Sequence, residues 1–118
     1  MNASEFRREL VKVMPGYDWT VHKSHAPEIC LVATGTKSSG FNRLSTLQVT
    51  RRVTDEGIGY EVKSAGYGKR APWLHTAGAL TLAKALRHLQ DHYETMARLY
   101  SGHASDLQVA RAAKAGAQ

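Results

Sequence analysis

The stretch that decides the fold is STLQVTRRVTDEGIGYEVKSAGY, which spans residues 45–67. Apolar and polar side chains alternate along its first part, which is the period of a β-strand with one buried and one open face. The side chains that point one way are Leu47, Val49 and Val53, with Arg51 among them, and those that point the other way are Thr46, Gln48, Thr50 and Arg52. Residues 54–57, Thr-Asp-Glu-Gly, have the composition of a tight turn. We therefore predict two antiparallel strands, Ser45–Val53 and Ile58–Tyr67, joined as a hairpin.

Two more strands are expected ahead of this hairpin. In residues 18–24, Trp19 and Val21 alternate with polar residues. Residues 28–36 contain Ile-Cys-Leu-Val-Ala, which is apolar on both faces and typical of a strand in the middle of a sheet. The sheet is therefore predicted to be antiparallel, with three to four strands.

A helix is predicted before the sheet. Phe6, Leu10 and Val13 recur at steps of four and three, which places them on one side of a helix. Ser4 is a suitable N-cap, and Pro15-Gly16 should end the helix.

A longer helix is predicted from Thr76, as its N-cap, to about Ser101. Its apolar residues recur at steps of four, three, four, three and four: Leu82, Leu86, Leu89, Tyr93, Met96 and Tyr100. Gly102 should end it, and Ser105 with Gln108 could cap a short final helix. Residues 66–73, with two glycines and Pro72, are expected to be irregular.

These elements predict an α+β fold with one domain in residues 1–102 and a short helical or disordered tail in residues 103–118. The long helix should pack on one sheet face. The other face, which bears Thr50, Arg52 and Lys63, should be free or buried in a dimer.

Composition limits the class of protein. The chain has 118 residues, of which 42% are hydrophobic and 22% charged, and this suits a folded domain with a hydrophobic core. We expect no membrane segment and no secretory signal, because no uncharged run is long and apolar enough. With Cys30 as the single cysteine, a reducing cytoplasm is the simplest location.

No catalytic or metal-binding pattern is present, so we expect neither an enzyme nor a cofactor. Cys30 lies within an apolar run and is expected to be a buried, inert thiol. His88 and His92 are one helical turn apart and could both reach a metal ion, but the residue after His88 is Leu89, where the metalloprotease pattern requires Glu.

Basic residues gather in the middle of the chain. Seven lie between Lys37 and Arg70, against three acidic ones, which accounts for four of the six net positive charges. Basic residues interleaved with aromatic ones suit a nucleic-acid surface, where cations meet phosphates and rings stack on bases. The candidate nucleic-acid-binding residues are Lys37, Arg43, Arg52, Lys63, Tyr67, Lys69, Arg70 and Trp73, and Phe41 lies in a neighbouring loop. The alternatives are that the Gly66–Arg70 loop is merely solvated, and that Trp73 fills a gap between the sheet and the long helix.

The order helix, strands, helix resembles that of the double-stranded RNA-binding domain. That family has a run of lysines at the start of its last helix, whereas residues 75–80 here are His-Thr-Ala-Gly-Ala-Leu. The resemblance therefore covers the order of elements, and no residue role is carried over from it.

Two hypotheses about function are preferred to a third, which is a metal or small-molecule protein that uses His88 and His92. The first is a small non-enzymatic protein that binds DNA or RNA through its basic sheet and loops. The second is a protein-interaction module or homo-oligomer that uses the open sheet face or the tail.

Overall fold

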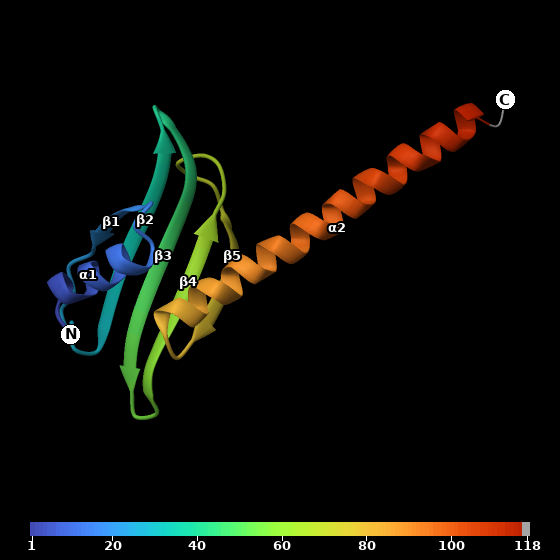
Figure 1. Ribbon diagram of the computed structural model, residues 1–118. Coiled ribbons are helices and arrows are strands. Elements are labelled where there is room, and N and C mark those ends of the chain that lie inside the picture. Colours follow the sequence, from blue (N-terminus) through green and yellow to red (C-terminus); the bar gives the residue numbers. More distant parts are fainter. Residues whose placement is uncertain (117–118) are drawn as a thin grey trace.

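A computed structural model describes residues 1–116, with side chains through Ala113. The elements in chain order are α1 (Ala3–Val13), β1 (Asp18–Val21), β2 (Cys30–Ser39), β3 (Asn42–Thr54), β4 (Gly57–Ala65), β5 (Trp73–Ala79) and α2 (Leu82–Gly116). The predicted α+β class is confirmed, with five strands in place of three to four (Figure 1).

The sheet is a meander in which every strand pairs antiparallel with the next one in sequence. The predicted hairpin forms its centre: β3 and β4 are joined by the two residues Asp55 and Glu56, and Val49 lies opposite Val62. Gly57, which follows the turn, has a φ of +123°, a value that residues with a side chain rarely adopt.

Both helices lie on the same face of the sheet, which we call the inner face (Figure 1). Phe6 and Leu10 of α1 are completely buried, and Leu82, Leu86 and Leu89 of α2 are buried in the same core. The sheet contributes Trp19, Leu31, Ala33, Leu47, Val49 and Val62. The predicted stripe of α1 and the first part of the predicted stripe of α2 thus pack as expected, whereas Met96 is half-buried and Tyr100 is 64% exposed.

The opposite, outer face of the sheet has no helix over it among the described residues. Cys30 lies on this face and is half-buried, so the prediction of a buried core cysteine is wrong. The reason is the alternation of β2, whose inner positions are taken by Leu31 and Ala33, so that Cys30 and Val32 face the uncovered side.

Strand β5 replaces the predicted start of the long helix. Residues 73–79 pair with β4, and Ala77 lies opposite Val62. The N-cap of α2 is Thr81, whose Oγ1 accepts a hydrogen bond from the backbone N–H of Lys84 at 3.2 Å, so Thr76 is not the cap. Likewise Asn2, not Ser4, caps α1, because its Oδ1 accepts from the N–H of Glu5 at 2.9 Å.

Helix α2 continues through Gly102 to Gly116, so the predicted end at Gly102 is wrong. One interior glycine costs a helix only about 1 kcal/mol, and good helix formers follow it here. The tail is therefore a continuation of α2; residues 117–118 of the predicted tail lie outside the described residues. Among the described residues, no helix is long and apolar enough to cross a membrane.

Candidate nucleic-acid interface

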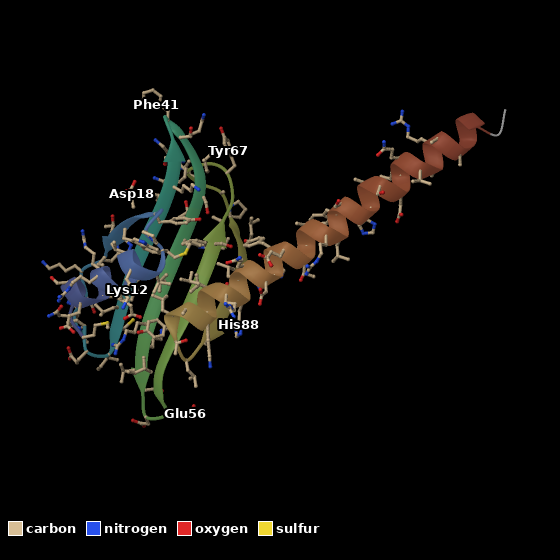
Figure 2. All side chains as sticks on the ribbon, viewed as in Figure 1. Lys12, Asp18, Phe41, Glu56, Tyr67 and His88 are labelled. Carbon is tan, nitrogen blue, oxygen red and sulfur yellow. The ribbon has the colours of Figure 1, made fainter. Side chains whose placement is uncertain are left out.

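The β4–β5 loop and the end of the β2–β3 hairpin meet at one end of the sheet. The backbone N–H of Gly68, in the loop between β4 and β5, donates a hydrogen bond of 2.9 Å to the carbonyl oxygen of Arg43, at the start of β3. Figure 2 shows Phe41 at the end of the β2–β3 hairpin and Tyr67 on the neighbouring loop, while Glu56 marks the opposite end of the sheet. We call residues 37–43 together with residues 66–72 the basic tip.

The basic tip presents aromatic rings to solvent. Phe41 is fully exposed, and Tyr67 is 67% exposed. Gly40 has a φ of +59° and occupies the first position of the two-residue β2–β3 turn, where glycine is favoured. The turn places Phe41 at its second position, beyond the sheet, where no residue of the core contacts it. Packing of this chain therefore gives no reason for an aromatic ring at Phe41.

The same two segments carry four cations. Lys37, Lys69 and Arg70 are exposed, and Arg43 is half-buried with a buried Nε–H that has no hydrogen-bond partner among the described residues. Neither segment of the basic tip contains an acidic residue. The nearest one in the sheet register is in β1, where Asp18 lies opposite Thr36. The basic tip is therefore a local concentration of positive charge.

Lys63 and Trp73 lie farther along the outer face. Trp73 is opposite Ala65 in the register, and the Lys63 Nζ lies 5.9 Å from the centroid of the Trp73 ring, within the range of a cation–π contact. Trp73 is 46% exposed on the outer face, so it does not fill a gap between the sheet and α2.

Arg52 lies away from the other candidates. It is nine residues from Arg43 along β3, a separation of about 30 Å at the rise of an extended strand. The structure therefore brings together Lys37, Arg43, Tyr67, Lys69 and Arg70, places Lys63 and Trp73 farther along the outer face, and leaves Arg52 near the opposite end.

Arg51 adds no charge to either exposed surface. It is only 7% exposed on the inner face, opposite Tyr60 of β4. Burial raises the pKa of the Tyr60 hydroxyl above its ordinary value, and Arg51 partly offsets this, while Glu9 of α1, whose Oε2 accepts a 3.5 Å hydrogen bond from that hydroxyl, raises it further. Arg51 thus belongs to a polar cluster beside the core.

Two of the histidines lie against each other. His92 stacks on His75 of β5, with ring centroids 3.5 Å apart, whereas His88 is exposed. Within residues 1–116, no group of three or more His, Cys, Asp or Glu side chains is arranged to hold a metal ion.

Comparisons of the chain with known protein families, with curated proteins and with solved structures found no match. The likeness to the double-stranded RNA-binding domain therefore stays limited to the order of elements.

Proposed function

We propose that this chain is a non-enzymatic protein that binds single-stranded nucleic acid through the basic tip. The observation that carries the proposal is that two exposed aromatic rings, Phe41 and Tyr67, and four cations lie on two segments that a hydrogen bond from Gly68 to Arg43 joins. An exposed aromatic ring at a hairpin turn contributes nothing to a core, whereas a ring among cations is the arrangement that binds unpaired bases.

The chemistry divides between the two residue types. Lys37, Lys69 and Arg70 would contact phosphates, which is the sequence-independent part of binding and the source of its salt dependence. Phe41 and Tyr67 would stack on bases. A duplex keeps its bases stacked on one another, so these rings favour a single strand. Trp73, with Lys63 beside it, offers a third ring farther along the outer face.

The proposal is tested by the fluorescence anisotropy of labelled single-stranded DNA and RNA oligonucleotides across a range of salt concentrations. We expect the logarithm of the association constant to fall linearly with the logarithm of the salt concentration. Tyr67→Ala should weaken binding by roughly 5- to 150-fold, the loss expected for one stacked base. Lys69→Glu should weaken it further and reduce the salt slope.

The matched control is Arg52→Glu, which makes the same change of charge near the opposite end of the sheet. It should retain most of the affinity, whereas Lys69→Glu should not. Equal losses from both variants would mean that net charge, and not the basic tip, governs binding. Absence of binding to either nucleic acid at low salt would reject the proposal.

The alternative, a homo-oligomer, is supported by a separate observation, the exposed second half of α2. That half of the helix is far from the basic tip in the sequence, and an oligomer formed through it would leave the proposed nucleic-acid interface a separate surface.

A further inference from the structure

The second half of α2 leaves the body of the protein. Near residue 93 the helix is attached to the sheet: the hydroxyl of Tyr93 is hydrogen-bonded to the hydroxyl of Ser64, and His92 stacks on His75. Beyond this point every side chain through Ala113 is exposed, except that of Met96, which is half-buried. We call residues 97–116 the arm, and Figure 1 shows it extending away from the sheet.

The arm gives the chain far more surface than a compact monomer has. The accessible area is 8501 Å², whereas folded monomers of 13.0 kDa average roughly 6,300 Å². The radius of gyration is 19.0 Å, against about 13.5 Å for a compact domain of this length. Roughly 2,200 Å² per chain is therefore in excess, and a dimer that buried even half of it on each chain would bury about 2,200 Å² in total, which is enough for a stable interface.

The apolar side of α2 continues along the arm. Eighteen residues complete five helical turns, so residues eighteen apart lie at the same angle around the axis. Leu107 therefore points in the direction of Leu89, and Tyr100 in the direction of Leu82. Leu82 and Leu89 are buried on the sheet, but Tyr100 and Leu107 are 64% and 68% exposed. The side of the helix that faces the sheet in its first half faces solvent in its second.

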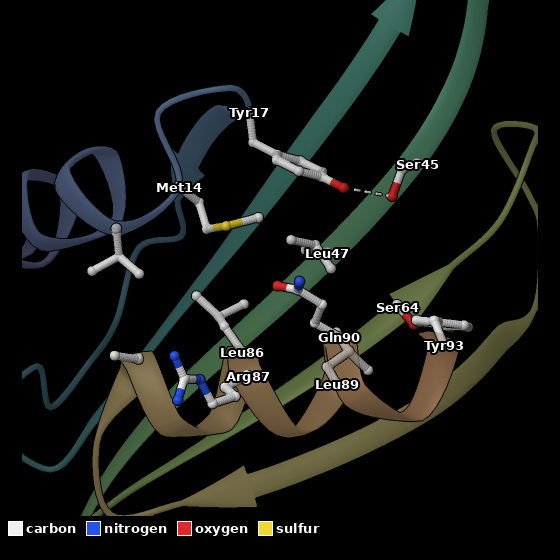
Figure 3. A pocket seen from close by; sticks show the side chains of 12 residues that line it. Met14, Tyr17, Ser45, Leu47, Ser64, Leu86, Arg87, Leu89, Gln90 and Tyr93 are labelled. Carbon is white, nitrogen blue, oxygen red and sulfur yellow. Dashed lines mark hydrogen bonds between the residues drawn. The ribbon is translucent and has the colours of Figure 1, made fainter. Parts of the chain in front are cut away.

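An apolar groove lies on the inner face between α1 and α2 (Figure 3). Its volume is 380 Å³, and α2 lines it from Ala83 to Tyr93, about 15 Å of helix. Leu47 of β3 and Met14, at the end of α1, provide its other apolar surface, so the groove exposes part of the core beside α2.

We propose that two copies of this chain form a two-fold symmetric dimer in which each arm occupies the groove of the partner. The two α2 helices would then run antiparallel, side by side, with the apolar side of each arm on the partner's inner face. A single two-fold rotation covers the arm and the groove of both chains, as a closed, isologous interface requires. The charges also agree, since Arg87 lines the groove and Asp106 immediately precedes Leu107 on the arm.

A parallel pairing along the whole of this side of α2 would clash with the sheets of the two chains. The first half of each helix has its own sheet on that side, in the space that the partner helix would need. The antiparallel arrangement avoids this, because each arm begins where its own sheet ends.

Sedimentation equilibrium of the full chain over a wide range of concentrations tests the dimer. We expect Leu107→Asp to raise the dimer dissociation constant at least about 100-fold, because two charges enter the apolar grooves of each dimer. Val109→Asp is the matched control: Val109 is 65% exposed and lies about 200° around the helix from Leu107, so this variant should remain dimeric. A chain that is monomeric at all concentrations, or equal weakening by both variants, would overturn the proposal.

Cross-linking tests the contact between arm and groove. In a Cys30→Ser background, Ala104→Cys places a thiol on the sheet-facing side of the arm, eighteen residues after Leu86, and Gln90→Cys places one at the groove. A short bifunctional maleimide should link the two chains when the variants are mixed. Efficient linking of Ala104→Cys to itself would indicate a contact between arms and would overturn docking in the groove.

Discussion

The packing of β1 against β2 depends on two residues, Trp19 and Gly35. Gly35 of β2 lies opposite Trp19 of β1, and the ring of Trp19 covers it. The indole N–H of Trp19 donates a hydrogen bond of 3.0 Å to the carbonyl oxygen of Met14, which holds the ring in place. A glycine is therefore required at residue 35 by the space that the ring takes.

We predict that Gly35→Ala lowers the free energy of unfolding by about 1–3 kcal/mol, the usual cost of overpacking. The added Cβ would lie 2.7 Å from a carbon of the Trp19 ring, which cannot move without losing its hydrogen bond. Urea denaturation followed by tryptophan fluorescence measures the change.

Gly59→Ala is the control for this prediction. Gly59 lies on the outer face opposite Arg52, and an added Cβ there would meet no atom within 4 Å. Its stability should stay the same or rise slightly, because alanine reduces the freedom of the unfolded chain. Equal stability of the two variants would show that Trp19 does not restrict residue 35.

At the scale of elements, the boundary between β5 and α2 is set by pairing with a neighbour. Residues 77–80, Ala-Gly-Ala-Leu, include no β-branched or aromatic residue, and Thr76 has the chemistry of an N-cap, so local preference favours a helix there. Hydrogen bonding to β4 extends the sheet instead, and the cap moves five residues to Thr81. Tertiary contacts outweigh local propensity because the differences in propensity are small.

We predict that Thr81→Ala destabilises the protein by about 1 kcal/mol, because the N–H of Lys84 loses its acceptor at the start of α2. Thr81→Asp should restore the stability or exceed it, since aspartate is a stronger cap and favours the positive end of the helix dipole. Thermal unfolding followed by circular dichroism at 222 nm compares the three proteins. Equal losses for both variants would argue against a capping role.

At the scale of the whole molecule, the main feature is the contrast between a small, well-packed body and a bare arm. The core includes Phe6, Leu31, Val49, Val62 and Leu89, yet Leu99, Tyr100, Leu107 and Val109 on the arm are all more than half exposed. Most of the stability of a helix in a protein comes from packing of its apolar side, which the arm lacks in the single chain. The arm should therefore gain stability from association.

We predict that the melting temperature of the wild-type chain rises with protein concentration, by about 3 °C for each tenfold increase, because a dimer is favoured by mass action. Leu107→Asp should melt at a temperature independent of concentration and equal to that of the dilute wild type, since Leu107 is exposed in the isolated chain. Scanning calorimetry at several concentrations measures both. A lower melting temperature for Leu107→Asp at high dilution would mean that Leu107 stabilises the monomer.

At the candidate site, too, the sequence predicts which residues gather in one segment but not where they lie in the fold. The sequence indicates that basic and aromatic residues gather between Lys37 and Trp73, because that is a property of neighbouring residues. It does not indicate that Phe41 and Tyr67 lie at one end of the sheet, or that Arg52 lies near the other. Those positions depend on the strand register and on the hydrogen bond from Gly68 to Arg43.

The sequence by itself determined the elements whose signal is local. The alternation and turn of residues 45–63 specify the β3–β4 hairpin, and the stripe from Leu82 to Tyr93 specifies the packed half of α2, since hydrophobic period and turn chemistry belong to consecutive residues. Only the tertiary structure decided that residues 73–79 are a strand, that residues 37–43 and 66–72 form the basic tip, and that the second half of α2 lies beyond its own sheet. Each of these depends on how distant parts of the chain are placed in space, which no local pattern records.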